Sequence, residues 1–393
     1  MTSKGITVTS LVCFIVCDGG PAAHFATFAS TLLAQYQLQS IIYATGPAWN
    51  KMNDSNLPLG IQLVPFVGDD LDRTQEEQVA TQLIDGCLKQ GARHIITDLG
   101  NKFDPVLQAA ASKYDLSSGK FRSWCYYDNP ESYVPGGYST KADETITASK
   151  GILFANMNLA QVDSKIYSLP GKDIDLTSKT VQGIGYYPVT DVEKLRRQRA
   201  IERDSLRAEN DWSNVQHLFV YFGGNNEEYF EKALPAFLFN LAQLDKTLLD
   251  DIFFLFQQHP AAKKLNRDGL LLQEWLSKNT HVQIRISTLK NSDQAQIVAD
   301  AALYYQTSMA PQFALLDLPI MQVGHEVYED ILVKHQLCHT ATNPIELARG
   351  FTEMKRRTES LSKLEERQQL IYNSIGYTSN WSENLHRIIF EHE

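Results

Sequence analysis

The feature that most constrains this chain is an alternation of short apolar β-type runs with amphipathic helical stretches, which occurs as two successive series. The runs of the first series are residues 7–17, 40–44, 61–67, 94–97, 121–127 and 151–154. Those of the second are residues 217–222, 252–257, 282–286, 302–305 and 320–323. This alternation is typical of parallel sheets with crossover helices. The sequence therefore predicts two doubly wound α/β units, with ligand sites at the carboxyl ends of their strands.

The length agrees with two units, because 393 residues exceed what one hydrophobic core usually serves. We expect a first domain over residues 1–190 and a second over residues 211–350. Residues 191–210 are dense in charges of both signs, which predicts a solvated helix that links the domains. The helical stretch 351–393 is expected to pack back on the first domain.

Composition excludes several classes of function. A net charge of -10 gives no attraction to the phosphates of nucleic acid. The apolar run near the N-terminus is too short for a transmembrane segment and lacks a cleavage site, so we expect a cytoplasmic protein. The five cysteines are spread without ligand spacing and are expected to be reduced core thiols.

One helix has clear end signals. Thr74 and Glu77 form a predicted capping box, and Gly91 is the predicted stop. Apolar residues at helical spacing lie between them. Together with the apolar runs 61–67 and 94–97 that flank it, this helix is predicted to form a βαβ unit.

The end of the first apolar run carries the first candidate site. Gly19 and Gly20 allow the backbone to approach a ligand closely, and His24 follows one turn later. An imidazole suits general-base catalysis because its ordinary pKa lies near working pH. His24 is therefore the catalytic candidate, and a structural histidine that packs the first helix is the alternative.

Two turns of the second series are candidate binding elements. Gly223, Gly224 and Asn225 follow its first apolar run, where either a ligand or a tight turn explains the glycines. His259 stands before Pro260 at the end of the next run, where it either lines a site or is a structural residue.

The segment from residue 304 to residue 324 is the most informative. A predicted strand is followed by Thr307 and Ser308, then by Pro311 in the first turn of a short helix. The start of a helix presents free N–H groups and a positive dipole, which suit a diphosphate. Gln312 in this helix can hydrogen-bond a sugar hydroxyl.

A tyrosine-rich segment that follows the fifth apolar run includes Tyr127, Asp128 and Glu131. Tyrosines stack on sugar faces and carboxylates accept hydrogen bonds from hydroxyls. The segment is either an acceptor-binding loop or an ordered loop without a ligand.

Motifs for metals and cofactors are weak. Two Asp-x-Asp triplets begin at Asp70 and Asp173, and we interpret both as loop carboxylates. The chain has no Cys/His zinc cluster, no G-x-x-x-x-G-K-[ST] loop and no G-x-S-x-G motif. We expect neither a metal nor a cofactor.

Two of these segments resemble known families. The stretch from Gly19 to His24 resembles the Gly-Gly-x-x-x-His stretch of several GT-B glycosyltransferases. The stretch from Thr307 to Gly324 resembles the donor-binding stretch of those enzymes and of the non-hydrolysing UDP-N-acetylglucosamine 2-epimerases, which have Ser-Gly-Gly-x-x-Glu-Glu-Ala. This chain has Met309 and Ala310 in place of the two glycines, and it lacks the two glutamates.

The resemblance implies the GT-B fold, in which two Rossmann-like domains face a central cleft and C-terminal helices cross back to the N-terminal domain. It implies a metal-independent glycosyltransferase with a nucleotide-sugar donor, expected to be UDP-linked, and an unknown acceptor. Thr307 and Ser308 would hold the diphosphate, and Gly223 and Gly224 would border the sugar. The alternatives are an epimerase-like isomerase and a non-catalytic nucleotide-sugar-binding or effector protein.

Overall fold

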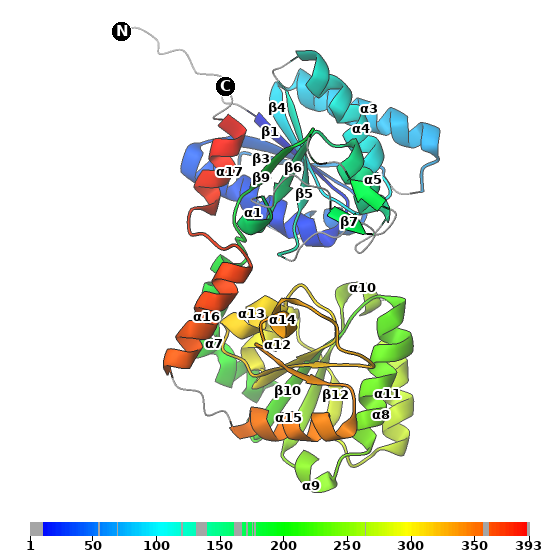
Figure 1. Ribbon diagram of the computed structural model, residues 1–393, viewed down its shortest axis with the longest axis vertical. Helices are drawn as coiled ribbons and strands as arrows, with labels where there is room; N and C mark the ends of the chain where they lie inside the picture. The colour runs from blue at the N-terminus through cyan, green and yellow to red at the C-terminus, as the bar shows by residue number, and fades with distance from the viewer. Residues whose placement is uncertain are drawn as a thin grey trace. The chain divides into compact units, whose positions relative to one another are not determined.

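The computed structural model describes residues 11–53, 56–68, 70–118, 121–130, 140–160, 167–169, 172–174, 176, 178–263, 265–356 and 361–390. The chain forms two compact units. The first contains Met1–Tyr187 and Ile375–Glu393, and the second contains Pro188–Ser374 (Figure 1).

The first unit is built on a parallel sheet of seven strands in the order β3-β2-β1-β4-β5-β6-β9. Its strands are β1 Leu11–Val16, β2 Gln39–Ala44, β3 Ile61–Pro65, β4 Ala92–Thr97, β5 Arg122–Tyr127, β6 Gly151–Phe154 and β9 Thr180–Gly183. A separate antiparallel pair is formed by β7 Tyr167–Leu169 and β8 Lys172–Ile174. The central strands are almost entirely buried because helices cover both faces, which explains their continuous apolar runs.

Helices pack on both faces of this sheet. They are α1 Gly19–Tyr36, α2 Gly46–Asn53, α3 Arg73–Lys89, α4 Asp104–Ser118, α5 Thr140–Ala148, α6 Met157–Ala160 and α17 Trp381–Phe390. On one face, α3 and α4 bury side chains against Cys13 and Ile15 of β1. On the other, Phe25 of α1 packs on Phe14, with the ring centroids 5.1 Å apart.

The start of α3 differs from the sequence prediction. The helix begins at Arg73, and Asp72 is its N-cap. The Asp72 side chain accepts the amide of Gln75, whose side chain accepts the amide of Asp72 in return. The capping box therefore lies two residues before the predicted pair, Thr74 and Glu77. Asp72 takes the N-cap position because aspartate is a strong N-cap residue and comes earlier in the chain.

The second unit repeats the architecture with a parallel sheet of six strands in the order β12-β11-β10-β13-β14-β15. Its strands are β10 His217–Phe222, β11 Ile252–Gln257, β12 Ile284–Ile286, β13 Ala301–Tyr304, β14 Ile320–Val323 and β15 His339–Ala341. Its helices are α7 Val189–Glu209, the π-helix η1 Tyr229–Ala233, α8 Leu234–Ala242, α9 Lys246–Leu249, α10 Pro260–Lys263, α11 Arg267–Lys278, α12 Ser292–Val298, α13 Ala310–Leu315, α14 Ile331–Lys334, α15 Pro344–Arg356 and α16 Leu361–Ser374. The expected pair of doubly wound α/β units is thus confirmed.

The charged helix α7 belongs to the second unit. Arg199 donates to the carbonyl oxygens of Gln296 and Ile297 at 2.9 and 2.6 Å. Arg207 lies 3.3 Å from Asp300 and is buried. The expectation of a solvated helix therefore does not hold for these arginines, which bind the end of α12 and the start of β13.

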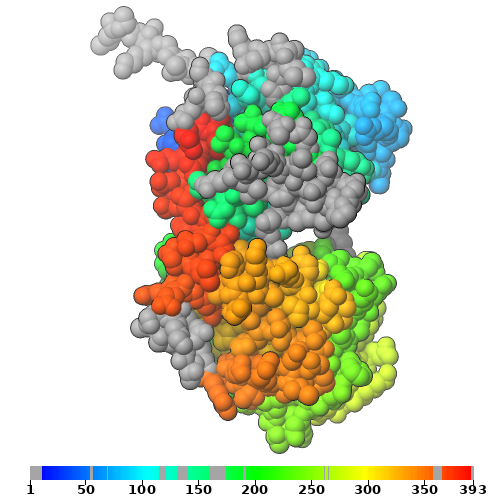
Figure 2. All heavy atoms as spheres, in the orientation of Figure 1, coloured from blue at the N-terminus to red at the C-terminus, as the bar shows by residue number. Residues whose placement is uncertain are grey.

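The C-terminal helices are divided between the units. Helix α15 lies at the surface of the second unit (Figure 2) and buries Leu347, Phe351 and Met354 in the core of that unit. Helix α16 packs on α13 in the same unit. Of the stretch expected to return, α17 belongs to the first unit, where Trp381 lies 5.7 Å from Phe28 between ring centroids.

Each sheet changes direction between its third strand and the next. In the first unit the change falls between β1 and β4, and in the second between β10 and β13. Ligands of doubly wound sheets bind beside the carboxyl ends of the strands at this position. The residues that directly follow these four strands are therefore the first candidates for a site.

Candidate functional site

At the carboxyl end of β1 the chain turns directly into α1. Asp18 is the N-cap residue, and Gly19 and Gly20 form the first helical turn. Gly20 is exposed, and a Cβ atom at that position would lie 3.5 Å from Oδ2 of Asp128. The structure therefore brings Gly20 and Asp128 together, two residues that the sequence analysis had placed in separate binding elements.

His24 lies one turn into α1 and is held by aromatic residues. Its Nδ1 is 2.8 Å from the hydroxyl of Tyr126, and its ring meets that of Tyr187 edge-on at 4.6 Å. Burial, together with the nearby positive charge of Lys51, lowers the pKa of His24 to about 3. The imidazole is therefore neutral at physiological pH and a weak proton acceptor.

Asp128 follows β5 and is half-buried. Burial raises the pKa of its carboxyl to about 6, with a further contribution from the negative charge of Asp98. A carboxyl with this pKa titrates near working pH, as a general base requires. Its neighbour Tyr127 faces the core and packs on Phe154, and the predicted residue Glu131 lies outside the described residues.

Beside Asp128, the structure shows buried carboxylates that the sequence analysis missed. Asp98 follows β4, and its Oδ2 accepts the amides of Cys17 and Asp18, each at 2.9 Å. Asp104, the first residue of α4, lies next to it, and burial raises the pKa of both carboxyls. The available signal was position, because Asp98 directly follows β4 and Asp18 lies two residues after β1, and the sheet changes direction between these two strands.

In the second unit, the turn after β10 is closed by Tyr229. A Cβ on Gly223 would lie 2.9 Å from the Tyr229 hydroxyl, and one on Gly224 would lie 2.8 Å from the ring. Packing against this tyrosine therefore accounts for both glycines. Asn225 is exposed, and Asn226 donates to Gln306 at 3.0 Å, which ties this turn to the one after β13.

The turn after β13 leads into α13. The Thr307 side chain accepts the amide of Met309 at 3.2 Å, and the Thr307 carbonyl accepts that of Ala310. The amide of Gln312 donates to Met309, and Pro311 has no N–H group. The helix start therefore offers fewer amides to a diphosphate than its sequence suggested. Ser308 is exposed and Gln312 is half-buried.

His259 precedes α10 at the end of β11. Burial lowers the pKa of its imidazole, while the charge of Asp268 opposes this shift. Asp268 is fully buried, accepts a hydrogen bond from Gln258 at 2.6 Å, and would lie 3.5 Å from a Cβ on Gly223. Asp268 thus connects the two predicted elements His259 and Gly223, although its position within a helical segment gave no signal in the sequence.

Comparison with known proteins gives a fold but no close relative. No protein-family model and no curated protein sequence matches this chain. The structure of a UDP-GlcNAc 2-epimerase from Neisseria meningitidis bound to UDP-GlcNAc is similar, with a TM-score of 0.67 and 11% identity over 97% of this chain and 100% of that one. The fold is of the GT-B type.

Two further structures share the GT-B fold. The UDP-GlcNAc 2-epimerase of Methanocaldococcus jannaschii has a TM-score of 0.67 and 12% identity over 97% of this chain and 99% of that one. A glycosyltransferase from Rickettsia africae has a TM-score of 0.65 and 10% identity over 98% of this chain and 99% of that one. Among the described residues, no helix of this chain is both long enough and apolar enough to span a membrane.

Proposed function

We propose that this chain is a glycosyltransferase that takes its sugar from a UDP-linked donor, and that Asp128 is its general base. The observation that carries the proposal is a half-buried carboxyl with a pKa of about 6, beside the exposed first turn of α1 at Gly20. GT-B relatives that bind UDP-GlcNAc support the choice of donor.

In the proposed reaction, Asp128 accepts the proton of an acceptor hydroxyl as its oxygen attacks the anomeric carbon. The bond from that carbon to the diphosphate breaks, and UDP leaves with the electron pair. Asp128 replaces His24 as the base, because the low pKa of the imidazole makes it the weaker proton acceptor at neutral pH. His24 would instead hold Tyr126 and the start of α1 in place.

The second unit would bind the nucleotide. Asn225 and Ser308 are exposed on neighbouring turns that the Asn226–Gln306 hydrogen bond joins, so both can reach one ligand. Because several amides of the α13 turn are engaged locally, side chains rather than backbone would make more of the contacts. We expect no metal to take part in sugar transfer.

A second candidate function is UDP-sugar epimerisation. Several similar structures are UDP-GlcNAc 2-epimerases, and the raised pKa values of Asp98 and Asp128 suit proton transfer to and from carbon. Against it, Phe313 and Ala314 stand where the resemblance places paired glutamates, and both residues are fully buried. Transfer to an acceptor therefore remains the first proposal.

The test follows the products of UDP-sugars with and without candidate acceptors. A transferase releases UDP only when an acceptor is present, whereas an epimerase forms a new UDP-sugar without one. Asp128→Asn should lower turnover by about 100-fold or more while UDP still raises the unfolding temperature. Asp143→Asn, at a half-buried aspartate of α5, is the matched control and should keep activity.

Three outcomes separate the candidates. No shift in unfolding temperature with UDP or any UDP-sugar would refute both enzymatic proposals. Binding without turnover of any donor would support a non-catalytic nucleotide-sugar-binding protein. Full activity of Asp128→Asn would show that Asp128 is not the general base, and His24 would then be the candidate base.

A further inference from the structure

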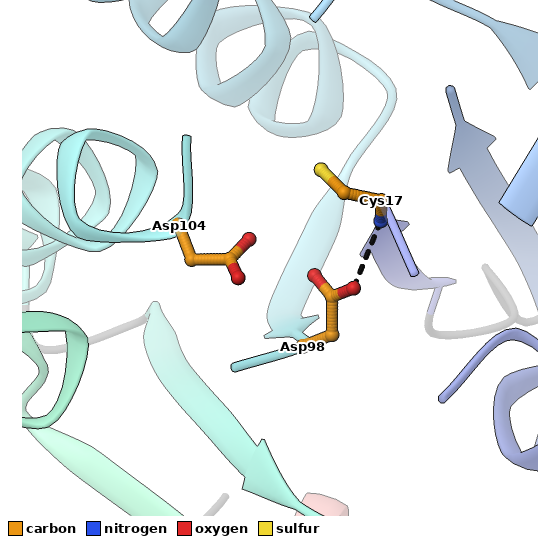
Figure 3. Close-up of side chains that lie close together, drawn as sticks. All are labelled: Cys17, Asp98 and Asp104. Atoms are coloured by element: carbon orange, nitrogen blue, oxygen red, sulfur yellow. Dashed lines mark hydrogen bonds between the residues drawn. The ribbon is translucent and has the colours of Figure 1, made fainter. Parts of the chain in front are cut away.

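Three potential metal ligands converge at the point where the first sheet changes direction. Cys17 follows β1, Asp98 follows β4, and Asp104 begins α4 (Figure 3). The Cys17 sulfur and one carboxylate oxygen of each aspartate all lie within 4.8 Å of one another. The side chains point into a common space, and all three residues are buried.

Each carboxylate in this cluster has one oxygen that accepts backbone amides and one oxygen that no N–H group reaches. Asp98 Oδ2 accepts two backbone amides, and Asp104 Oδ2 accepts the amide of Asn101 at 2.7 Å. Oδ1 of Asp98 and Oδ1 of Asp104 are buried and accept no hydrogen bond from an N–H or hydroxyl group of the described residues, and the two carboxyls lie close enough to share a proton. Both aspartates are fully buried, so water at the surface does not solvate these oxygens.

Such an arrangement requires a positive partner. Two buried carboxylates side by side repel one another, and an unpaired buried charge is costly. Among the described residues, no lysine or arginine forms an ion pair with Asp98 or Asp104; the nearest such pair in sequence, Lys102 with Glu76, is separate. The partner is therefore either a shared proton or a bound cation.

We propose that Cys17, Asp98 and Asp104 bind one divalent metal ion, with Zn²⁺ the ion that this donor set fits best. A thiolate with two carboxylates is a mixed sulfur and oxygen set that zinc accepts and that magnesium and calcium do not. Donor atoms held tetrahedrally at about 2.0–2.3 Å from zinc lie roughly 3.5 Å from one another. Side-chain movements that shift the donor atoms by about 1 Å would therefore bring them to bonding distance of one ion. The thiol proton leaves on binding.

With three protein ligands, this ion would keep its fourth position for water, and it would be separate from the proposed sugar transfer. It would join the end of β1 to the start of α4, and so fix the backbone that leads to Gly19 and Gly20. Its binding would stabilise the first unit and leave the second unchanged. The proposal does not depend on the identity of the sugar, the acceptor or the base.

The first experiment measures zinc binding by the full chain. The protein is stripped with a chelator, titrated with Zn²⁺, Mn²⁺ or Mg²⁺, and examined by elemental analysis and thermal unfolding. We expect one zinc per chain and an unfolding temperature that rises with zinc concentration, with little response to magnesium. Asp104→Asn and Cys17→Ser should lose that response.

Matched controls separate loss of the site from general damage to the core. Asp268→Asn changes a fully buried aspartate of the second unit that also has an unpartnered oxygen, and Cys125→Ser changes a buried cysteine of β5. Both should keep the full zinc response. Circular dichroism of the metal-free variants shows whether each one folds.

A spectroscopic measurement makes the test independent of stability. Cobalt bound in place of zinc should give a thiolate-to-metal charge-transfer band in the near ultraviolet for the wild type and for Cys125→Ser. The band should be absent from Cys17→Ser. A wild type without stoichiometric metal, without a zinc response and without this band overturns the proposal. In that case the aspartates share a proton, and Asp104→Asn should stabilise the protein at neutral pH.

Discussion

Oδ2 of Asp98 accepts the backbone amide of Asp18 at 2.9 Å, which ties the residue after β4 to the N-cap of α1. The same oxygen accepts the amide of Cys17. Because 80 residues separate Asp98 from Asp18 in sequence, this one side chain fixes a tertiary contact as well as a turn. The position of the glycine turn beside Asp128 therefore depends on a residue that would not itself contact the sugar acceptor.

Replacement of Asp98 should separate its role as an acceptor from its charge. Asp98→Ala leaves two amides without their acceptor and should lower the free energy of unfolding by about 2–4 kcal/mol. Asp98→Asn keeps an oxygen for both amides and removes a buried charge, so its loss should be smaller. Urea denaturation in the presence of a chelator measures both values. Equal losses for the two variants would show that the amide bonds contribute little.

The glycines after β10 should respond differently to a change in Tyr229. An alanine at Gly223 collides with the Tyr229 hydroxyl, whereas one at Gly224 collides with the ring. Each substitution should cost about 1–3 kcal/mol of stability. Tyr229→Phe should recover much of the loss in Gly223→Ala and little in Gly224→Ala. Double-mutant cycles by chemical denaturation measure this coupling, and equal recovery at both positions would contradict the assigned contacts.

His24 should make stability depend on pH in a defined direction. Its pKa is about 3 in the folded protein against 6.5 for an ordinary histidine. Between these values the unfolded chain binds a proton that the folded chain does not, so this residue destabilises the fold as pH falls. His24→Phe should therefore show a flatter decline of stability than the wild type from about pH 6.5 downward. Denaturation curves over that range provide the comparison, and identical slopes would indicate an ordinary pKa.

Asp300 should be important for the attachment of α7. It pairs with Arg203 and Arg207 and accepts the amide of Leu218 at 2.8 Å. Asp300→Asn leaves the buried Arg207 without its carboxylate and should cost about 3 kcal/mol. Asp204→Asn, at an exposed residue of the same helix, should change stability by less than about 0.5 kcal/mol. A small effect at Asp300 would mean that apolar contacts alone hold the helix.

The strands were predictable because the strands of a parallel sheet are buried on both faces and so form continuous apolar runs. All eleven runs became strands, with boundaries shifted by a few residues at most where both ends are described. The short strands β9 and β15 were missed since they lie at sheet edges and are only partly buried. Edge strands carry little of the signal that central strands carry.

The candidate site was harder to predict because its residues are far apart in sequence and only the strand order of the sheet brings them together. Gly20 and Asp128 were each singled out in the sequence, yet nothing local shows that they are neighbours. Asp98 and Asp104 were missed although an aspartate after an apolar run is visible in the sequence. The strand order places the ends of β1 and β4 together, and only with that order does Asp98 become a candidate.

The place of α17 affects the order in which the chain can fold during synthesis. Domains usually fold as they emerge, with the N-terminal one first. Here Trp381 supplies part of the aromatic cluster around Phe28 and Tyr187, so a nascent chain that ends at Ser374 leaves that cluster incomplete. The second unit has all of its own segments at that length. The later unit in sequence is thus the first to have all of its core segments, and the N-terminal unit reaches a full core only after α17 has been synthesised.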